Sequence, residues 1–376
     1  MHPGARAGPT GGYRLNGPRV LALTGLETGP VLWRIYQPFT ELQARGYGAW
    51  FRDKDDPEMG TLEWAYLVAT RVDAISIPRF FWHDHAVSRD WVRTLHNAGV
   101  AFIYDLDDDA ITPTFGARQQ ATTERDKSLA ELEQDRRDRI AAMRLCDGVT
   151  VSTPELAAVV RQYVDSPVIV VPNAVDIPWW RQTLHGARRQ IPPLTVGWAG
   201  GARYPEDLVP VAEAWHNVAR RRQHVQFVVQ GHAAAVLLES VPADRLHMIP
   251  WLDLAEYPRG LRNIDIGCCA VADTHFNRCK TPIKAWEFTM AGAAVVVSPT
   301  LYSQAVTDEE DGLIADAAAE WEAALIRLID EPALRRRLHR AQRRRVATEH
   351  ALHRTVLNWP NAWATILEHF RQRRAA

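Results

Sequence analysis

Residues 277–299 read NRCKTPIKAWEFTMAGAAVVVSP, and this stretch decides the fold class. Thr281 can cap a helix, Pro282 fits the first helical position, and Gly292 stands where that helix would end. The apolar run from Ala293 to Ser298 is typical of a short buried strand. A helix followed at once by a buried strand is a repeating unit of an α/β sheet, so we expect an α/β fold.

The same stretch contains an anion site. The first turn of the helix carries unpaired N–H donors, and Lys280 lies just before it. Lys284 and Glu287 share one face of the helix, because residues three apart are neighbours there. Lys280 places a cation at the entrance of the helix, and Glu287 places a carboxylate about two turns further along. This arrangement suits a nucleotide-sugar, which has phosphates at one end and hydroxyls at the other. The alternative is an ordinary surface pair on an amphipathic helix.

Composition sets further limits. A chain of 376 residues is too long for one ordinary core and favours two domains. The formal net charge of −1 gives no general attraction to nucleic acid or membrane. We find no apolar run long enough for a membrane span and no signal peptide. Neither the number nor the spacing of the four cysteines indicates a disulfide framework or a zinc site, so a cytoplasmic location is expected.

Strands and helices are predicted to alternate along both halves of the chain. Strands are predicted over 19–23, 74–78, 100–104, 148–152, 168–171, 194–198, 225–229, 246–249, 264–269 and 293–298. Helices are predicted over 31–45, 63–70, 88–97, 121–145, 207–221, 281–291, 320–329 and 332–346, with others beginning near 153 and 353.

This alternation predicts two Rossmann-like domains that face each other across a cleft. Ligands of such parallel sheets bind at the carboxyl ends of the strands. The C-terminal helix is expected to pack back toward the first domain. The predicted divisions are a disordered segment 1–15, a first domain 16–176, a linker 177–193, a second domain 194–350 and a helical tail 351–376.

Several motifs in this order carry a family resemblance. They are VSTPEL at 151–156, VPNAVD at 171–176, VGWAGG at 196–201, the series Lys280, Lys284, Glu287 and Ala291-Gly292, GLIA at 312–315, and Glu320-Trp321. With them the chain resembles the retaining glycosyltransferases of the two-Rossmann-domain GT-B fold, in particular glycosyltransferase family 4. The resemblance covers nearly the whole chain.

The resemblance implies roles for the helix that follows Lys280. It places Glu287 against the ribose hydroxyls of the donor nucleotide and Lys280 on the diphosphate. The family often has a second glutamate near the donor sugar, and Cys279 stands at that position here. Lys284 and Thr281 belong to the same expected donor site.

Glycines and one arginine complete the expected donor site. Arg203 is the candidate for a second phosphate cation, and the Gly200-Gly201 turn would let backbone N–H groups approach the phosphate. The loop 25–30, which includes Gly29, matches the family's glycine loop near the donor phosphates and the acceptor. Arg34 and Arg79 are further candidates for the acceptor side of the cleft.

Residues 105–109 read DLDDD after a buried strand, and these carboxylates repel one another unless something compensates. One compensation is a divalent metal on Asp107 and Asp108, although a metal is not expected. Another is a role in the cleft, where Asp105 or Asp107 would orient the acceptor and Asp108 would line the site. The third alternative is a capped turn with solvated carboxylates. Relatives often carry a histidine near the reacting sugar at the position of Asp105.

The function predicted is metal-independent, retaining transfer of a sugar from a UDP- or GDP-sugar to an acceptor hydroxyl. Lys280, Arg203 and the helix N-terminus would stabilise the leaving diphosphate, which would itself take the acceptor proton. No other cofactor is expected. The acceptor is open: a glycan, a lipid-linked molecule, a small molecule or modified DNA.

Three other functions stay open at this point. One is a phage-type transferase acting on modified DNA bases, and another is a nucleotide-sugar epimerase or hydrolase. The third is a non-catalytic nucleotide-sugar-binding subunit, which Cys279 at the glutamate position favours. The arginine runs at 335–337 and 343–345 indicate a solvated helix face, or a contact with nucleic acid or with the inner membrane face.

Overall fold

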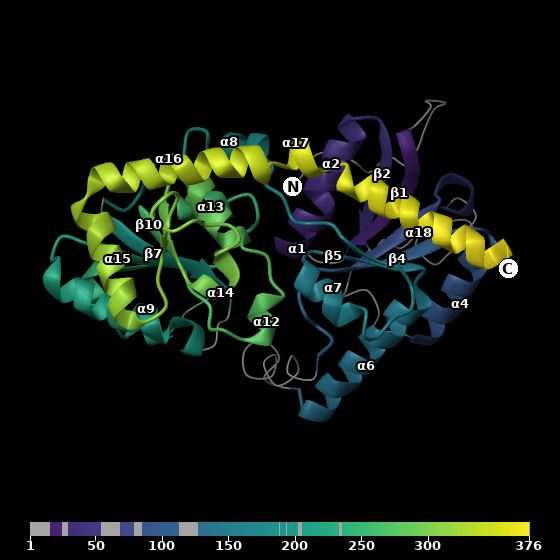
Figure 1. Ribbon diagram of the computed structural model, residues 1–376, viewed down its shortest axis with the longest axis horizontal. Helices are drawn as coiled ribbons and strands as arrows, with labels where there is room; N and C mark the ends of the chain where they lie inside the picture. Colours follow the sequence, from purple (N-terminus) through teal and green to yellow (C-terminus); the bar gives the residue numbers. More distant parts are fainter. Residues whose placement is uncertain are drawn as a thin grey trace.

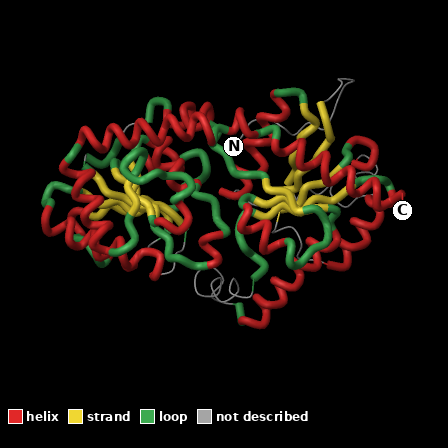
Figure 2. Tube along the Cα trace, viewed as in Figure 1, coloured by secondary structure: helices red, strands yellow, loops and turns green. Residues whose placement is uncertain are grey.

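The computed structural model describes residues 16–24, 29–53, 68–78, 85–112, 127–187, 189–192, 194–201, 205–232 and 235–375. Figure 2 shows two separate sheets in this part of the chain, each flanked by helices. Both sheets have six strands, and all the strand pairs that the described residues form are parallel. No helix in the described ranges combines the length and the apolar character needed to cross a membrane.

The first sheet has the strand order β2-β1-β3-β4-β5-β6. Val20 of β1 pairs with Ala74 of β3, and Pro78 at the end of β3 pairs with Asp105 of β4. Its central strands are buried on both faces, as expected for a parallel sheet between helices. The strands are β1 (Asn16–Thr24), β2 (Tyr47–Asp53), β3 (Ala74–Pro78), β4 (Ala101–Leu106), β5 (Gly148–Val151) and β6 (Val168–Val170).

The second sheet has the strand order β12-β11-β10-β7-β8-β9. From its other edge this is the order 3-2-1-4-5-6 of a dinucleotide-binding fold, with the direction of winding reversed between β7 and β10. Gly231, at φ 105°, ends β8 so close to β7 that an added Cβ would lie 2.3 Å from the Gly200 carbonyl oxygen. The strands are β7 (Thr195–Gly200), β8 (Gln226–Gly231), β9 (Leu246–Ile249), β10 (Ile266–Cys269), β11 (Ala294–Val297) and β12 (Leu313–Ile314).

Two helices of the first domain, α6 and α7, begin at side-chain caps. Ser128 and Glu131 form a reciprocal capping box, and Thr153 accepts from the N–H of Leu156 ahead of Pro154. The elements are α1 (Gly29–Val31), the π-helix η1 (Leu32–Tyr36), α2 (Gln37–Ala44), α4 (His85–Asn97), α6 (Leu129–Leu145) and α7 (Pro154–Val160).

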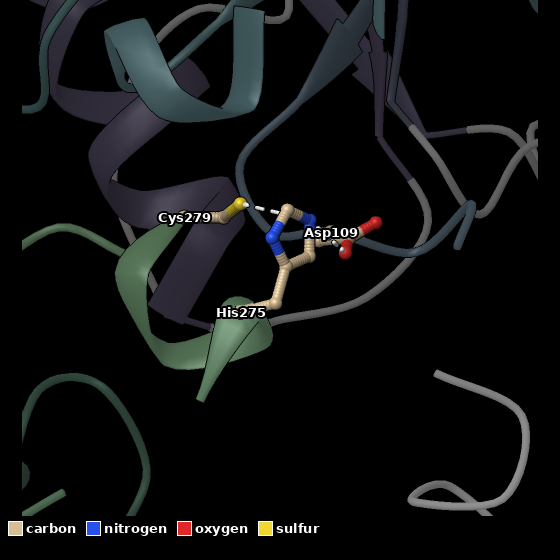
Figure 3. A group of neighbouring side chains, drawn as sticks. All are labelled: Asp109, His275 and Cys279. Carbon is tan, nitrogen blue, oxygen red and sulfur yellow. Dashed lines mark hydrogen bonds and ion pairs between the residues drawn. The ribbon is translucent and has the colours of Figure 1, made fainter. Parts of the chain in front are cut away.

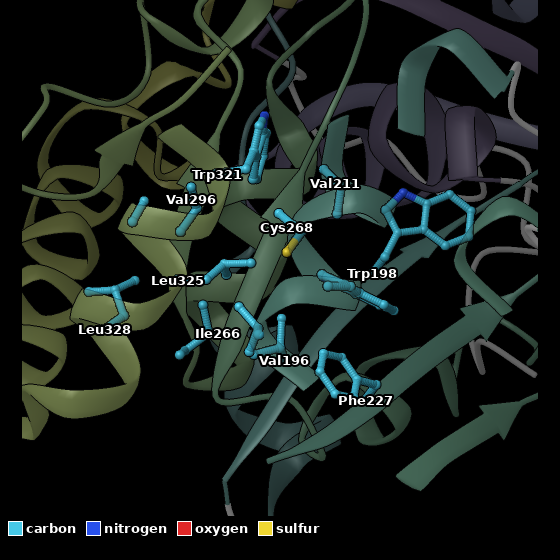
Figure 4. Close-up of a cluster of buried hydrophobic side chains, with 14 of the residues drawn as sticks. Val196, Trp198, Val211, Phe227, Ile266, Cys268, Val296, Trp321, Leu325 and Leu328 are labelled. Atoms are coloured by element: carbon cyan, nitrogen blue, oxygen red, sulfur yellow. The ribbon is translucent and has the colours of Figure 1, made fainter. Parts of the chain in front are cut away.

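The helices of the second domain cover both faces of its sheet. One face packs against α9 and α15 around Trp215 and Trp321, and Figure 4 shows Trp321 and Phe227 within this core. The other face packs against α8, α13 and α16. The elements are α8 (Ile177–Leu184), α9 (Pro205–Arg221), α10 (Ala235–Leu238), the 3-10 helix η2 (Ala243–Arg245), α11 (Tyr257–Leu261), α12 (His275–Arg278), α13 (Ile283–Ala291), α14 (Pro299–Tyr302), α15 (Ala318–Asp330) and α16 (Pro332–Glu349).

The C-terminal chain connects the two domains a second time. Figure 1 shows α16 along the second domain, followed by α17 (Leu352–Thr355) and α18 (Asn358–Ala375) along the first. Val175 and Ala351 form a parallel bridge at the crossing point. On α18, Trp359 and Trp363 pack against Phe39 in the core of the first domain. The predicted return of the C-terminal helix to the first domain is confirmed.

The predicted two-domain α/β architecture is confirmed, with differences in detail. Strand β2 was not predicted. The segment 177–193, predicted as a linker without regular structure, contains α8, which Asp176 caps by accepting from the N–H of Trp179 at 3.0 Å. The segment 1–15, predicted to be disordered, and most of the predicted helix 63–70 lie outside the described residues.

Candidate functional site

The reversal between β7 and β10 locates the candidate site. Neighbouring parallel strands whose connections leave in opposite directions open a crevice at their carboxyl ends. Here that crevice receives Gly200 and Gly201 after β7 and the segment 270–282 after β10. It faces the first domain, because Thr153 donates its hydroxyl to the carbonyl oxygen of Cys279 at 2.8 Å.

A buried network holds the segment after β10 in place. Asp207, in the first turn of α9, accepts from the Ala272 N–H and from Asn277 Nδ2, both at 2.8 Å. Thr274 caps α12 by accepting from the Asn277 N–H at 3.2 Å. Asp207 and Asn277 are 4% and 1% exposed, so the hydrogen bond between their side chains is shielded from water and fixes the chain just ahead of Lys280.

The entrance of α13 differs from the prediction by one residue. The helix begins after Pro282 without a side-chain cap, so the prediction that Thr281 caps it is wrong. The Thr281 hydroxyl instead accepts from Asn173 Nδ2 of the first domain at 3.1 Å. Gly292 ends the helix at φ 112°, as predicted. The N-cap position falls on Pro282, one residue after Thr281, and proline has no side-chain acceptor for the first turn.

Lys284 and Glu287 lie on one face of α13, as the spacing predicts, and form an ion pair. Tyr257 of α11 donates its hydroxyl to the same carboxylate oxygen of Glu287, Oε2, at 2.7 Å. Burial and the charge of Glu287 raise the pKa of Tyr257 well above its ordinary value, so its hydroxyl remains a donor. Glu287 is 5% exposed, and no described residue donates a hydrogen bond to its other oxygen, Oε1.

The remaining predicted donor residues surround this helix. The ammonium of Lys280 lies 4.3 Å from the ring centre of Phe276. Gly200 ends β7, and an added Cβ there would meet the Trp198 ring at 2.8 Å. An added Cβ on Gly201 would come no closer than 3.9 Å to Trp251. Arg203 lies outside the described residues.

Arg34 and Asp105, both predicted for the cleft, are bound to each other. The guanidinium makes a bidentate pair with the carboxylate, at 2.7 Å and 3.1 Å, and both side chains are buried. Thr150 of β5 donates to Asp105 at 2.6 Å, and Arg34 also reaches Asn173 at 3.1 Å. Trp359 of α18 lies under the guanidinium at 4.5 Å. The pair therefore ties η1 to β4 and α18, and direct contact of either group with an acceptor stays a prediction.

The carboxylates after β4 have different environments. Asp107 and Asp108 are half-buried, and the backbone carbonyl of Asp107 accepts from Ser152 at 2.8 Å. Asp109, for which no role was predicted, is fully buried and forms the turn. It accepts from the Thr112 hydroxyl at 2.6 Å and from the Thr112 N–H at 3.1 Å. Metal binding by Asp107 and Asp108 stays a prediction.

The acceptor side is described only in part. Gly29 begins α1, and an added Cβ would meet nothing within 4 Å. Arg79 lies outside the described residues.

A mixed cluster spans the two domains beside Lys280. His275 Nε2 lies 3.6 Å from Asp109 Oδ2 and 4.0 Å from Cys279 Sγ, and Figure 3 shows the three side chains converging. Burial and then the charges of Asp109, Glu155 and Asp108 raise the pKa of the Cys279 thiol to about 12. Cys279 stands at the expected glutamate position, and its side chain packs within the core of the first domain.

Sequence reasoning did not find Tyr257, Asn173 or His275 as site residues. Tyr257 is 30 residues before Glu287 and on a short helix, so no local spacing connects them. Asn173 lies within the VPNAVD motif, which contributed to the family resemblance but gave no role for the Asn173 side chain. The approach of His275 to Asp109 depends on how the domains dock, which the sequence does not encode locally.

Comparison with known proteins bears on the second domain and on the fold. Residues 203–359 match the family model described as "Glycosyl transferase-like", which spans most of the second domain. No curated protein matches the sequence. Solved structures match almost the entire chain. The fold is GT-B.

Three such structures illustrate the match. Sucrose-phosphate synthase from Thermosynechococcus elongatus has a TM-score of 0.61 at 14% identity, covering 93% of this chain and 99% of its own. Anabaena HepE in complex with UDP and glucose has a TM-score of 0.60 at 12% identity, covering 93% and 100%. A glycosyltransferase from Rickettsia africae has a TM-score of 0.60 at 11% identity, covering 94% and 99%.

The Arg34–Asp105 pair predicts a large stability loss when one partner is neutralised. In Asp105→Asn the buried guanidinium loses its counter-charge, and we expect the free energy of unfolding to fall by about 3–5 kcal/mol. Asp73→Asn is the matched control, because its pair with Arg19 at 2.8 Å is partly exposed and should cost about 1 kcal/mol or less. Urea unfolding measures both, and equal losses would contradict the assignment.

The raised pKa of Tyr257 predicts a pH dependence. An unfolded tyrosine loses its proton near pH 10 while the folded Tyr257 keeps it, so stability falls as pH rises above about 10. Tyr257→Phe removes this contribution, about 1.4 kcal/mol per pH unit. Urea unfolding on both sides of that pH should show a shallower decline for Tyr257→Phe than for wild type or for the control Tyr47→Phe. Identical slopes would show that Tyr257 ionises freely in the folded chain.

Proposed function

We propose that this protein is a glycosyltransferase that moves a sugar from a nucleotide-diphosphate sugar to an acceptor hydroxyl, with retention of configuration. The match of residues 203–359 to a glycosyl transferase-like family supports the reaction class. The fold it shares with HepE, whose structure contains UDP and glucose, supports a UDP-sugar as the first donor to test. No bound metal is required by the proposal.

The observation that carries the proposal is the buried carboxylate of Glu287. Tyr257 and Lys284 hold Oε2 by their own hydrogen bonds, which fixes the orientation of the carboxylate. Oε1 has no donor among the described residues, and in the proposed complex it faces the crevice as an acceptor. Ribose hydroxyls are donors that suit such an oxygen, since a buried carboxylate is stabilised by accepting hydrogen bonds.

Positive charge at the other end of the same helix suits the diphosphate. In the proposed complex, Lys280 and the N-terminus of α13 stabilise charge on the leaving phosphate, while the backbone at Gly200 and Gly201 approaches it. Arg203, from the loop after β7, supplies a second cation. Glu287 lies four residues into α13, about 6 Å along the helix axis from its first residue, Ile283, so the carboxylate and the N-terminus of the helix can contact different parts of one nucleotide.

The first domain supplies the acceptor side. Asp107 and Asp108 follow β4 at the carboxyl edge of the sheet and orient the acceptor hydroxyl in the proposed complex. Arg34 and Asp105 act as positioning residues, because their buried pair fixes η1 and the end of β4. The departing phosphate takes the acceptor proton, and the acceptor oxygen bonds to the anomeric carbon on the same face of the sugar from which the phosphate leaves. Contact between the domains excludes water, whose attack would be the competing hydrolysis.

Glu287→Gln tests the donor site with little change of shape. We expect UDP to bind about 10- to 100-fold more weakly, because a charge-assisted hydrogen bond contributes about 1.5–3 kcal/mol. Isothermal titration with UDP measures the effect. Glu256→Gln is the matched control, since this carboxylate is exposed on the neighbouring turn and pairs with Arg259 at 3.0 Å. Equal affinities for wild type and Glu287→Gln would contradict the assignment of Glu287.

Product analysis tests the reaction itself. Incubation of a UDP-sugar with candidate acceptors should release UDP and give a product with the donor's anomeric configuration, detected by NMR. Donor turnover without any acceptor would instead favour an epimerase or hydrolase. UDP binding without turnover on any acceptor would favour a non-catalytic binding subunit.

A further inference from the structure

The Asp109–His275–Cys279 cluster has the form of a cation site and no part in the proposed transfer. One member comes from the first domain, on the turn after β4, and two come from the second, on α12 and its C-terminal cap. Their potential ligand atoms all lie within 4.8 Å of one another. Carboxylate, imidazole and thiol together make a set that binds zinc in many proteins.

The arrangement differs from a proton relay. In a Cys–His–Asp triad the thiol and the carboxylate contact opposite nitrogens of the imidazole. Here both Asp109 Oδ2 and Cys279 Sγ have their shortest contact with the same nitrogen, Nε2, at 3.6 Å and 4.0 Å. The oxygen of Asp109, the sulfur of Cys279 and Nε2 of His275 therefore surround a common point, as the ligands of a metal ion do.

The spacing is close to that of a zinc site. Tetrahedral zinc with bonds of about 2.3 Å to sulfur and about 2.0–2.1 Å to nitrogen and oxygen separates S from N by about 3.6 Å and N from O by about 3.3 Å. The separations of 4.0 Å and 3.6 Å are a few tenths of an ångström wider, and the sulfur and the carboxylate oxygen lie within 4.8 Å of each other. Binding therefore needs an inward movement of the side chains of about 1 Å or less.

The surroundings favour a cation. Asp109 is 0% exposed and is oriented by the Thr112 hydroxyl at 2.6 Å, as an outer-shell donor orients a metal ligand. In the described part of the chain, His275 is the ion-pair partner found for this buried carboxylate. The carboxylates of Glu155 and Asp108 add negative charge near Cys279. The His275 side chain is 57% exposed, which provides a path from solvent.

We propose that Asp109, His275 and Cys279 bind one Zn²⁺ ion between the two domains. Binding converts the thiol to a thiolate, and its proton passes to the solvent. Three protein ligands leave a fourth position for water or for an anion. Because the ligands come from both domains, the ion fastens the second domain to the turn after β4, beside the entrance of α13.

Cobalt is the probe, because Co²⁺ occupies zinc sites and a thiolate ligand gives it a charge-transfer absorption band. The full chain, stripped with chelator and desalted, should bind one equivalent of Co²⁺ with this band, and Zn²⁺ should displace it. Zn²⁺ should also raise the melting temperature, because it binds the folded chain. This test needs neither donor nor acceptor, so it is independent of the proposed transfer.

Two variants make the test specific. Cys279→Ser should lose the charge-transfer band, and His275→Ala should bind Co²⁺ at least 10-fold more weakly. His275→Ala is expected to fold because its side chain is largely exposed, whereas Cys279 is buried. His353→Ala, an exposed histidine elsewhere, is the matched control and should behave as wild type. The proposal is overturned if wild type shows no thiolate band, or if His275→Ala binds Co²⁺ as tightly as wild type.

Discussion

The parallel arrangement of both sheets is the constraint on which the rest of the structure depends. Parallel strands need crossover connections, so every described strand delivers its carboxyl end to the same edge of its sheet. In the second sheet the crossovers reverse direction between β7 and β10, and the crevice opens there. The segment that leads into α13 leaves β10 at this point, which places Lys280 and the start of α13 beside this edge of the sheet.

Contacts between the domains turn this edge into a shared site. Cys279 packs into the core of the first domain, while Leu32 and Trp33 of η1 pack into the core of the second. The chain crosses between the domains at Val175 and again at Ala351, and these residues pair with each other. The buried Arg34–Asp105 pair stiffens the first domain where it meets this junction. The geometry of the site therefore depends on how the two domains pack against each other as much as on either sheet.

The sequence was informative wherever one local pattern decided the structure. The strands 74–78 and 246–249 have the predicted bounds, and Gly292 ends α13 as expected. Strand β2 was missed because Tyr47–Asp53 is a half-buried edge strand without a continuous apolar run. Helix α8 was missed although its start signals are present, since Asp176 is its N-cap and Pro178 lies in its first turn. The segment has no clear apolar periodicity, so it was interpreted as a linker. Tyr257 and His275 meet their partners only through tertiary structure.

The central claim is that the crevice beside α13 binds the nucleotide of a sugar donor. A crystal structure of the full chain with bound UDP tests it most directly. The ribose hydroxyls should donate to Oε1 of Glu287, and the diphosphate should lie between Lys280 and the first turn of α13. A nucleotide bound away from β7 and β10, or one whose ribose does not contact Glu287, would show that this crevice is not the donor site.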